Sequence, residues 1–210
     1  LRASDAAKEK RLVFYDCARA PRSFNARGSA TWRRYLYMVP LIESQNEDLD
    51  VEWVDKVMRA LEGKTLPFNS FAVGENRKTG EGLKDLCTMY VSRASRVSSI
   101  EENGPDFVCV ELVGSRFLRR MVRLLVASAV REASKPLELR DENVLLKICD
   151  ADDRSLPASA FPGAGLCFAG VGFSYTDFAF YKLQPKAEAA RLRELFLSTE
   201  EVTEEETEEK

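Results

Sequence analysis

Residues 107–132 read FVCVELVGSRFLRRMVRLLVASAVRE, and the periodicity of the sequence changes within this stretch. From Phe107 to Val113 the side chains fall into two alternating sets, which predicts a strand. From Arg116 to Glu132 apolar residues recur at helical spacing, which predicts a helix. A turn at Asn103-Gly104-Pro105 separates this strand from another predicted strand near Cys87 to Arg93. The centre of the chain therefore predicts an antiparallel hairpin followed by a deeply embedded helix.

Elements on both sides of this centre extend the prediction. Between Asp50 and Gly63 apolar residues recur at helical spacing, with Asp50 placed to cap the helix and Gly63 placed to end it. The other predicted elements are strands at 12–17, 34–39 and 166–171, a polar surface loop at 69–84, and helices at 141–149 and 186–197. Because strands and helices do not alternate strictly, we expect an α+β fold with a mostly antiparallel sheet.

Composition excludes several kinds of chemistry. The 210 residues are 45% hydrophobic and 31% charged, which is enough apolar material for a globular core. The chain contains no histidine, which excludes histidine general bases, Ser-His-Asp triads and His-ligated metals. The five cysteines form no C-x-x-C pair, so we expect free thiols in a reducing, intracellular compartment rather than a zinc ribbon. No apolar run approaches the roughly 20 residues that span a bilayer.

The two ends of the sequence differ from its middle. Residues 198–210 hold seven Glu and one Lys, a charge of −6, so the net charge of −3 leaves +3 on residues 1–197. Such a segment buries too little apolar surface to offset its ordering entropy, which predicts a disordered acidic tail after residue 197. The chain starts with Leu1 and lacks both an initiator Met and a secretory signal, so we expect a fragment of a longer protein.

Arginines gather in two places. On the predicted helix, Arg116, Arg119, Arg120 and Arg123 fall within a stripe of about 100°. Carboxylates inside the protein and RNA phosphates are both candidate partners for this stripe, and the helix alone does not decide between them. Arginines and aromatic rings also interleave at 22–37, as in sites that grip unpaired nucleotides. The alternative is a strand whose rings pack into the core, with Tyr35 and Tyr37 on the same side.

Several motifs resemble one family in the order in which that family carries them. Residues 26–37, ARGSATWRRYLY, are similar to the A-R-F-S-A-x-x-R-R-Y-x-Y motif of the TruA family of tRNA pseudouridine synthases. Residues 117–123, FLRRMVR, resemble its F-x-x-x-M-V-R helix. Asp153-Arg154 and residues 162–168, PGAGLCF, resemble its D-R and A-P-A-x-G-L-x-L segments.

The resemblance implies a pseudouridine synthase fold, present in part, and an isomerase that converts uridine to pseudouridine in tRNA without a cofactor or a metal. It implies that Tyr35 is the active-site tyrosine, which stacks on the uracil, and that Arg123 pairs with the catalytic aspartate. RNA contacts are then expected from the remaining basic residues of the two motifs, Arg27, Arg33, Arg34, Arg119 and Arg120. The family also implies a homodimer with tRNA lying across both subunits.

The sequence departs from the family pattern at the nucleophile. The catalytic aspartate of the family lies in a G-R-T-D-x-G-V-H-A motif, and no such motif occurs in this chain. We therefore expect the C-terminal portion of the catalytic region, at 1–197, which is inactive by itself. An alternative is a non-catalytic RNA-binding protein of the same fold. A third hypothesis is a scaffold whose arginines only satisfy internal carboxylates.

Overall fold

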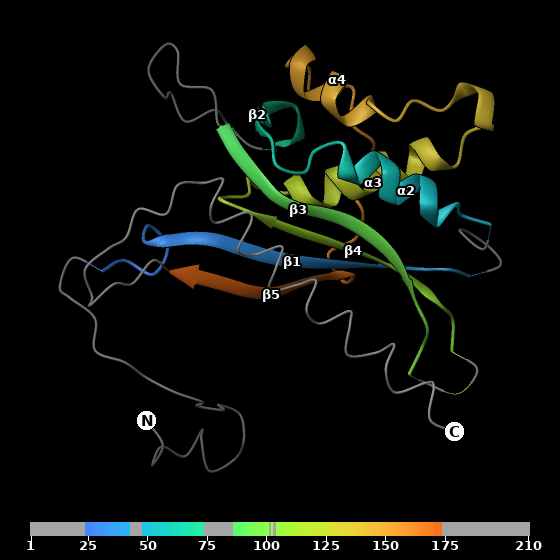
Figure 1. Ribbon diagram of the computed structural model, residues 1–210, viewed down its shortest axis with the longest axis horizontal. Coiled ribbons are helices and arrows are strands. Elements are labelled where there is room, and N and C mark those ends of the chain that lie inside the picture. Colours follow the sequence, from blue (N-terminus) through green and yellow to red (C-terminus); the bar gives the residue numbers. More distant parts are fainter. Residues whose placement is uncertain (1–23, 43–47, 74–85, 101, 103, 174–210) are drawn as a thin grey trace.

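The computed structural model describes residues 24–42, 48–73, 86–100, 102 and 104–173. The predicted strand at 12–17, the predicted helix at 186–197 and the predicted tail at 198–210 lie outside these residues. Within them the structure is an α+β protein with one antiparallel sheet and three α-helices (Figure 1). The predicted fold class is confirmed.

The sheet has five strands in the order β2-β3-β4-β1-β5, and every neighbouring pair is antiparallel. The strands are β1 (Ala30–Pro40), β2 (Thr65–Pro67), β3 (Leu86–Val97), β4 (Phe107–Gly114) and β5 (Leu166–Phe173). The predicted hairpin is the β3–β4 pair, in which Val97 lies opposite Phe107. β1 lies between β4 and β5, so Tyr35 is opposite Leu112 on one side and Phe168 on the other.

The helices cover one face of the sheet (Figure 1). They are α2 (Val51–Arg59), α3 (Met121–Ala133) and α4 (Val144–Ala151), with short 3-10 turns η1 (Asn69–Phe71) and η2 (Leu137–Leu139) between them. α3 lies deepest, because 11 of its 13 residues are buried. Its apolar side chains meet Tyr37 and Val39 of β1 in the main core. The prediction of a deeply embedded helix is confirmed for this part of the sequence.

α2 begins and ends as its sequence predicts. The Asp50 carboxylate accepts a hydrogen bond from the backbone N–H of Trp53 at 3.0 Å, which satisfies a donor of the first turn. The chain leaves the helix through Gly63, whose φ of +74° lies in the left-handed region that glycine adopts without strain. The cap and the stop fix the length of α2.

Two carboxylates, one in α2 and one just after it, also protect the open edge of β3. β2 pairs only with the first residues of β3, from Leu86 to Thr88. Beyond that point the backbone N–H of Ser92 donates to Glu62 at 3.3 Å and that of Ala94 donates to Asp55 at 2.8 Å. An unprotected strand edge is a template for pairing with another chain. Here side chains from the helix layer take up these donors.

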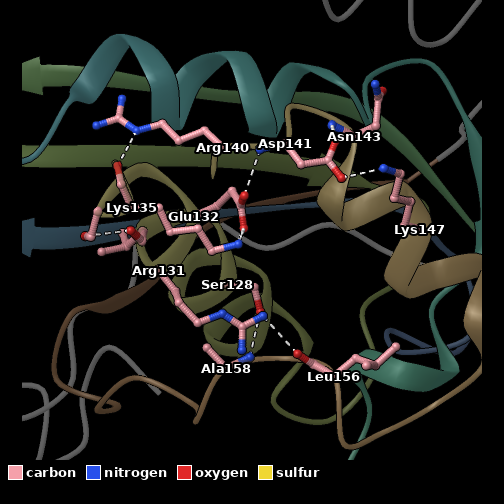
Figure 2. A network of polar contacts seen from close by, with 12 residues as sticks. Ser128, Arg131, Glu132, Lys135, Arg140, Asp141, Asn143, Lys147, Leu156 and Ala158 are labelled. Carbon is pink, nitrogen blue, oxygen red and sulfur yellow. Dashed lines mark hydrogen bonds and ion pairs between the residues drawn. The ribbon is translucent and has the colours of Figure 1, made fainter. Parts of the chain in front are cut away.

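A network of polar contacts surrounds the C-terminal end of α3 (Figure 2). Glu132 is fully buried, and its carboxylate accepts hydrogen bonds from Lys135 Nζ at 2.6 Å and from the backbone N–H of Asp141 at 2.8 Å. Asp141 in turn pairs with Lys147 at 2.6 Å, which lowers the pKa of the Asp141 carboxyl. Arg140 donates to the carbonyl of Lys135 at 2.7 Å. The network ties the end of α3 to the start of α4.

The predicted helix at 116–132 is wrong at its first turn. α3 begins only at Met121, and Arg120 before it has a φ of +66°, which is not a helical conformation. The turn from 116 to 120 is held from outside the helix, because Val73 N–H donates to the Arg119 carbonyl at 3.2 Å. Arginine fits a helix well by propensity, so periodicity alone does not reveal this turn. The four arginines therefore do not form one helical stripe.

The predicted polar surface loop at 69–84 is wrong at its start. Ser70 and Phe71 lie in η1 and are buried. The hydroxyl of Ser70 donates to the carbonyl of Ile148 at 2.8 Å, which joins η1 to α4. A buried hydroxyl needs such a partner, and this one is 78 residues away in the chain. The polar composition of the segment hides this contact.

Candidate functional site

A pocket of about 440 Å³ opens where β1, the 116–120 turn, α3 and the start of β5 meet. Its lining is Arg27, Tyr35, Phe117, Leu118, Arg119, Arg120, Met121, Val122, Arg123 and Leu166. The turn that replaces the expected helical start is therefore the main wall of the pocket. It brings Arg119 and Arg120 to the same opening as Tyr35, which comes from the inner strand β1.

The pocket is positively charged. Four of its ten lining residues are arginines, and none of the ten carries a carboxylate. Among the residues that the structure describes, none of the four arginines forms an ion pair. Guanidinium groups do not lose their charge at physiological pH and bind carboxylates and phosphates through planar pairs of N–H donors. This arrangement favours an anionic ligand.

Tyr35 lines the pocket and belongs to a cluster of rings. The ring of Tyr35 meets the edge of Phe117 at 5.0 Å between centroids and 77° between planes. Phe168 lies 5.2 Å away on the neighbouring strand. No residue within the described part of the chain makes a hydrogen bond to the Tyr35 hydroxyl. Aromatic rings arranged in this way fix one another, and they offer a surface on which a planar group can stack.

Tyr37 shares the side of β1 with Tyr35, as the sequence predicts, but it lies in the core. Its side chain is 3% exposed, and its hydroxyl donates to the Pro162 carbonyl at 2.7 Å. Burial raises the pKa of Tyr37, and the nearby charge of Arg123 acts in the opposite direction. Tyr37 stays protonated and serves as a support for the segment that precedes β5.

Arg123 leaves α3 toward this same segment. Its Nε donates a hydrogen bond to the Phe161 carbonyl, and the N–H of Phe161 donates back to the Arg123 carbonyl at 3.4 Å. The same segment approaches β1 closely at Gly165, where a Cβ atom would stand 2.6 Å from the Met38 carbonyl oxygen. The close approach of these backbones allows only glycine there, and it holds the segment against β1.

The predicted RNA-binding arginines fall into two groups. Arg27, Arg119 and Arg120 line the pocket. Arg34 instead pairs with Glu111 at 2.6 Å, and it lies on β1 in alternation with Tyr35, on the opposite face of the sheet. Arg33 donates to backbone carbonyls and does not line the pocket. Arg34 thus has an internal carboxylate partner, whereas within the described ranges the arginines of the pocket have none.

Sequence reasoning gave no role to three residues that shape the site. Phe117 and Phe168 hold the ring of Tyr35, and Leu166 closes the pocket at the start of β5. All three lie in segments that the sequence analysis quoted for their resemblance to family motifs. The signal was present in the motifs, but only the strand pairing shows that these side chains converge.

Two of the described cysteines are unsuited to act as nucleophiles. Cys87, Cys109, Cys149 and Cys167 are free thiols. Burial raises the pKa of Cys109, and it raises that of Cys149 to about 12. Since the thiolate is the reactive form, these two side chains stay inert near neutral pH.

Within the described ranges no cluster of three Cys, Asp or Glu residues could hold a metal ion. In the same ranges no helix is both long enough and apolar enough to cross a membrane. No family model matches the chain.

Curated relatives match most of the chain. It is 32% identical over 165 residues to tRNA pseudouridine synthase A of Thermotoga petrophila, covering 73% of this chain and 61% of that protein. The values for the protein of the same name from Thermotoga maritima are identical. The Jannaschia sp. protein of that name is 30% identical over 174 residues, covering 78% of this chain and 62% of its own length. The chain thus spans about three fifths of the length of these relatives.

The antiparallel sheet with helices on one face belongs to the pseudouridine synthase class of folds, of which this chain carries a part. The relatives narrow this class further. The chain belongs to the TruA family of tRNA pseudouridine synthases.

Proposed function

We propose that this chain forms the tRNA-binding, arginine-bearing part of an enzyme that isomerises uridine to pseudouridine in tRNA. The observation that carries the proposal is the pocket, which Tyr35 lines together with four arginines that have no described carboxylate partner. A nucleotide combines an anionic phosphate with a planar base, and both are matched here. Stacking on a ring and pairing with guanidinium groups are the usual means of holding an unpaired base.

In this proposal the pocket residues have separate tasks. The uracil of a flipped uridine stacks on Tyr35, and Arg27, Arg119 and Arg120 bind the flanking phosphates. During the isomerisation the glycosidic bond to N1 breaks and a bond from the same sugar carbon to C5 forms. The proton on C5 leaves, and N1 gains a proton, so atoms and electrons balance without a cofactor. The hydroxyl of Tyr35 is proposed to assist the removal of the C5 proton.

Arg123 is the proposed partner of the catalytic aspartate. A carboxylate in a partly enclosed site stays ionised when a fixed cation lies beside it. Arg123 can supply this cation because its backbone and its Nε are held by the Phe161 segment. The remaining nitrogens of the guanidinium are then free to form a paired contact with a carboxylate.

We propose that the aspartate itself comes from sequence beyond this chain, so the chain alone binds tRNA without turnover. This rests on the missing G-R-T-D motif and on the partial coverage of the relatives. The whole enzyme is proposed to be a homodimer that holds tRNA across both subunits. Residues 1–197 are proposed to form the C-terminal part of its catalytic region, followed by a disordered acidic tail at 198–210.

Two measurements on the chain test the proposal. Fluorescence anisotropy with an unmodified tRNA transcript should show saturable binding. The logarithm of the association constant should fall linearly with the logarithm of the salt concentration. Incubation with tRNA tritiated at C5 of uracil should release no tritium. Failure to bind tRNA at low salt contradicts the proposed function. Tritium release by the chain alone contradicts only the external origin of the aspartate.

A third measurement tests Arg123 in a longer protein that contains the motif. Arg123→Met should abolish tritium release there, because the carboxylate loses its cation. In the present chain the same substitution should be tolerated or stabilising, since it removes a charge that has no carboxylate partner among the described residues. Full activity of the Arg123→Met variant of the longer protein would remove Arg123 from the site.

A second candidate function is a non-catalytic RNA-binding protein with the same pocket, and the missing motif favours it. The coding sequence upstream of Leu1 distinguishes the two. A G-R-T-D motif there supports the enzyme, and its absence from the complete protein supports the binding protein.

A further inference from the structure

We infer that Arg33 is a positioning residue that sets the distance between the two arginine-bearing walls of the pocket; this inference rests on the proposed binding of tRNA. Arg33 lies on β1 beside the pocket but not in its lining. Its guanidinium binds three backbone carbonyls. Nη1 donates to Ser115 at 2.6 Å and to Ala30 at 3.3 Å, and Nη2 donates to Arg27 at 2.7 Å.

The first wall is the turn at 25–29, which carries Arg27. Within the turn the side chain of Asn25 accepts hydrogen bonds from the backbone N–H groups of Arg27 at 3.0 Å and Gly28 at 2.8 Å. The Ser29 hydroxyl accepts a hydrogen bond from the Asn25 N–H at 3.1 Å. These contacts close the turn upon itself, but they do not attach it to the rest of the pocket. The bond from Arg33 to the Arg27 carbonyl links the turn to the guanidinium that also contacts Ser115.

The second wall is the turn at 116–120, which follows Ser115 and carries Arg119 and Arg120. Ser115 is fixed to β3, because its N–H donates to the Thr88 carbonyl at 2.9 Å and its hydroxyl accepts from the Thr88 N–H at 2.9 Å. Arg33 is therefore anchored to a fixed point at one end and holds the Arg27 turn at the other. Its guanidinium thus joins the carbonyl of Arg27, which lines the pocket, to the carbonyl of Ser115, which directly precedes the turn that carries Arg119 and Arg120.

Only arginine can make this set of contacts. Its planar guanidinium presents N–H donors in fixed directions, whereas the single ammonium of lysine is a compact charge on a flexible stem. The acceptors are carbonyls, which need directed donors rather than a charge. Arg33→Lys therefore preserves the charge and loses the tether, which separates a positioning role from a phosphate contact.

Binding of an unmodified tRNA transcript, followed by anisotropy, tests the inference. Arg33→Lys and Arg33→Gln should weaken binding by a similar factor of about ten, because both release Arg27, whose charge-assisted contact is of that size. In the Arg27→Gln background, Arg33→Gln should weaken binding by less than twofold. A direct phosphate contact at Arg33 gives the opposite results. Lysine then retains binding, and the losses at positions 27 and 33 multiply.

The matched control is Arg96→Gln. Arg96 is an exposed arginine that pairs with Asp106 at 3.0 Å near the far end of the β3–β4 hairpin. Its removal changes the net charge of the protein as much as Arg33→Gln does, and it should change tRNA affinity by less than twofold. An equal loss in both variants would mean that net charge explains the effect, and the positioning role would be rejected.

Trypsin provides a readout that needs no RNA. Release of the turn should accelerate cleavage after Arg27 in Arg33→Lys relative to the unaltered chain, and an unchanged cleavage rate contradicts the tether. If the chain binds no tRNA, the proposed function fails while this measurement still decides the tether. If the Arg33 variants do not fold, Asn25→Ala loosens the same turn from inside. Its loss of tRNA affinity should vanish in the Arg27→Gln background, and an additive loss contradicts the inference.

Discussion

Both ends of α3 carry charged side chains, and the two ends differ in how these charges are matched. At the N-terminal end the pocket gathers four arginines without a carboxylate among its lining residues. At the C-terminal end Glu132, Asp141, Lys135 and Lys147 satisfy one another directly or through backbone groups (Figure 2). The contacts at the C-terminal end stabilise the fold, whereas the arginines at the N-terminal end are proposed to bind RNA.

The energetics of the two ends explain this difference. Glu132 is completely buried, and a carboxylate withdrawn from water costs several kcal/mol unless donors and a cation compensate for it. The arginines at the other end line an open pocket, so they keep contact with water and do not require partners for folding. Changes at the matched end should therefore alter stability, and changes at the pocket should alter RNA binding.

The largest expected effect is at Glu132. Glu132→Ala should lower the free energy of unfolding by about 3 kcal/mol, because it leaves the Asp141 N–H without an acceptor and creates a cavity in place of the buried side chain. Glu132→Gln keeps an acceptor of similar shape and should cost about half as much. Urea titrations measure both values, and tRNA affinity of the folded variants should stay within twofold. A loss below about 1 kcal/mol for alanine would show that the matched end is not essential to stability.

The second expected effect is at the pocket. Replacing Arg119 and Arg120 together by Gln should weaken tRNA binding at least tenfold and reduce the salt slope by about 0.7 to 0.9 units for each lost phosphate contact. The free energy of unfolding should stay within about 0.5 kcal/mol of the unaltered chain, as for most surface substitutions. Anisotropy at several salt concentrations measures the slope. An unchanged slope would mean that these arginines do not face RNA.

The third expected effect is at Asp50, which belongs to the matched side of the molecule. Asp50 caps α2, and it also pairs with Arg140 at 2.5 Å. Loss of the cap in Asp50→Ala should cost about 1 kcal/mol. The backbone N–H of Trp53, and then Arg140, hold the pKa of Asp50 below its ordinary value.

The sign of this pKa shift predicts a pH dependence. A carboxyl whose pKa is lower in the folded state stabilises the fold above its unfolded pKa of about 4, and this stabilisation disappears as the pH falls through the folded value. The unaltered chain should lose more stability than Asp50→Asn between pH 4 and lower pH. Thermal melts at matched pH values test this, and equal losses in both proteins would contradict the role of Asp50.

The smallest expected effect is on the free energy of unfolding at Arg120. Its φ of +66° is strained for a side chain with a Cβ, so Arg120→Gly should raise the free energy of unfolding by about 0.5 kcal/mol. The same substitution should weaken tRNA binding, since it removes a guanidinium. Arg119→Gly is the matched control, because Arg119 has no positive φ and should lose stability. Opposite signs at the two positions would show that the pocket trades stability for binding.

Much of the fold could be predicted from local sequence. α2 carries its cap at Asp50 and its stop at Gly63, and β4 shows the alternation of side chains that predicts a strand. The first turn of α3 could not be predicted in this way. The left-handed conformation of Arg120 is associated with contacts from elsewhere, including the bond from Val73 to Arg119, and periodicity contains no information about such contacts.

The candidate site shows the same division. Tyr35 and Arg123 could be identified from motifs, and the structure places both at one pocket. The difference between Arg33 and Arg34 could not be predicted, although the two residues are adjacent. One contacts a carbonyl 82 residues away, and the other pairs with Glu111 across the β1–β4 register. Which partner each arginine meets depends on long-range strand pairing rather than on its neighbours in sequence.

The position of β1 between β4 and β5 has a consequence for the order of folding. β1 is the first described strand in the chain, yet its partners come much later, with Tyr37 opposite Val110 and Leu166. Pairing over such sequence distances is slow because loop closure costs entropy before any contact forms. We expect the β3–β4 hairpin to form first and β1 to pair with β4 afterwards, so that the other edge of β1 stays open until β5 has been synthesised. During this interval on the ribosome, the open edge of β1 is a site where aggregation starts or a chaperone binds.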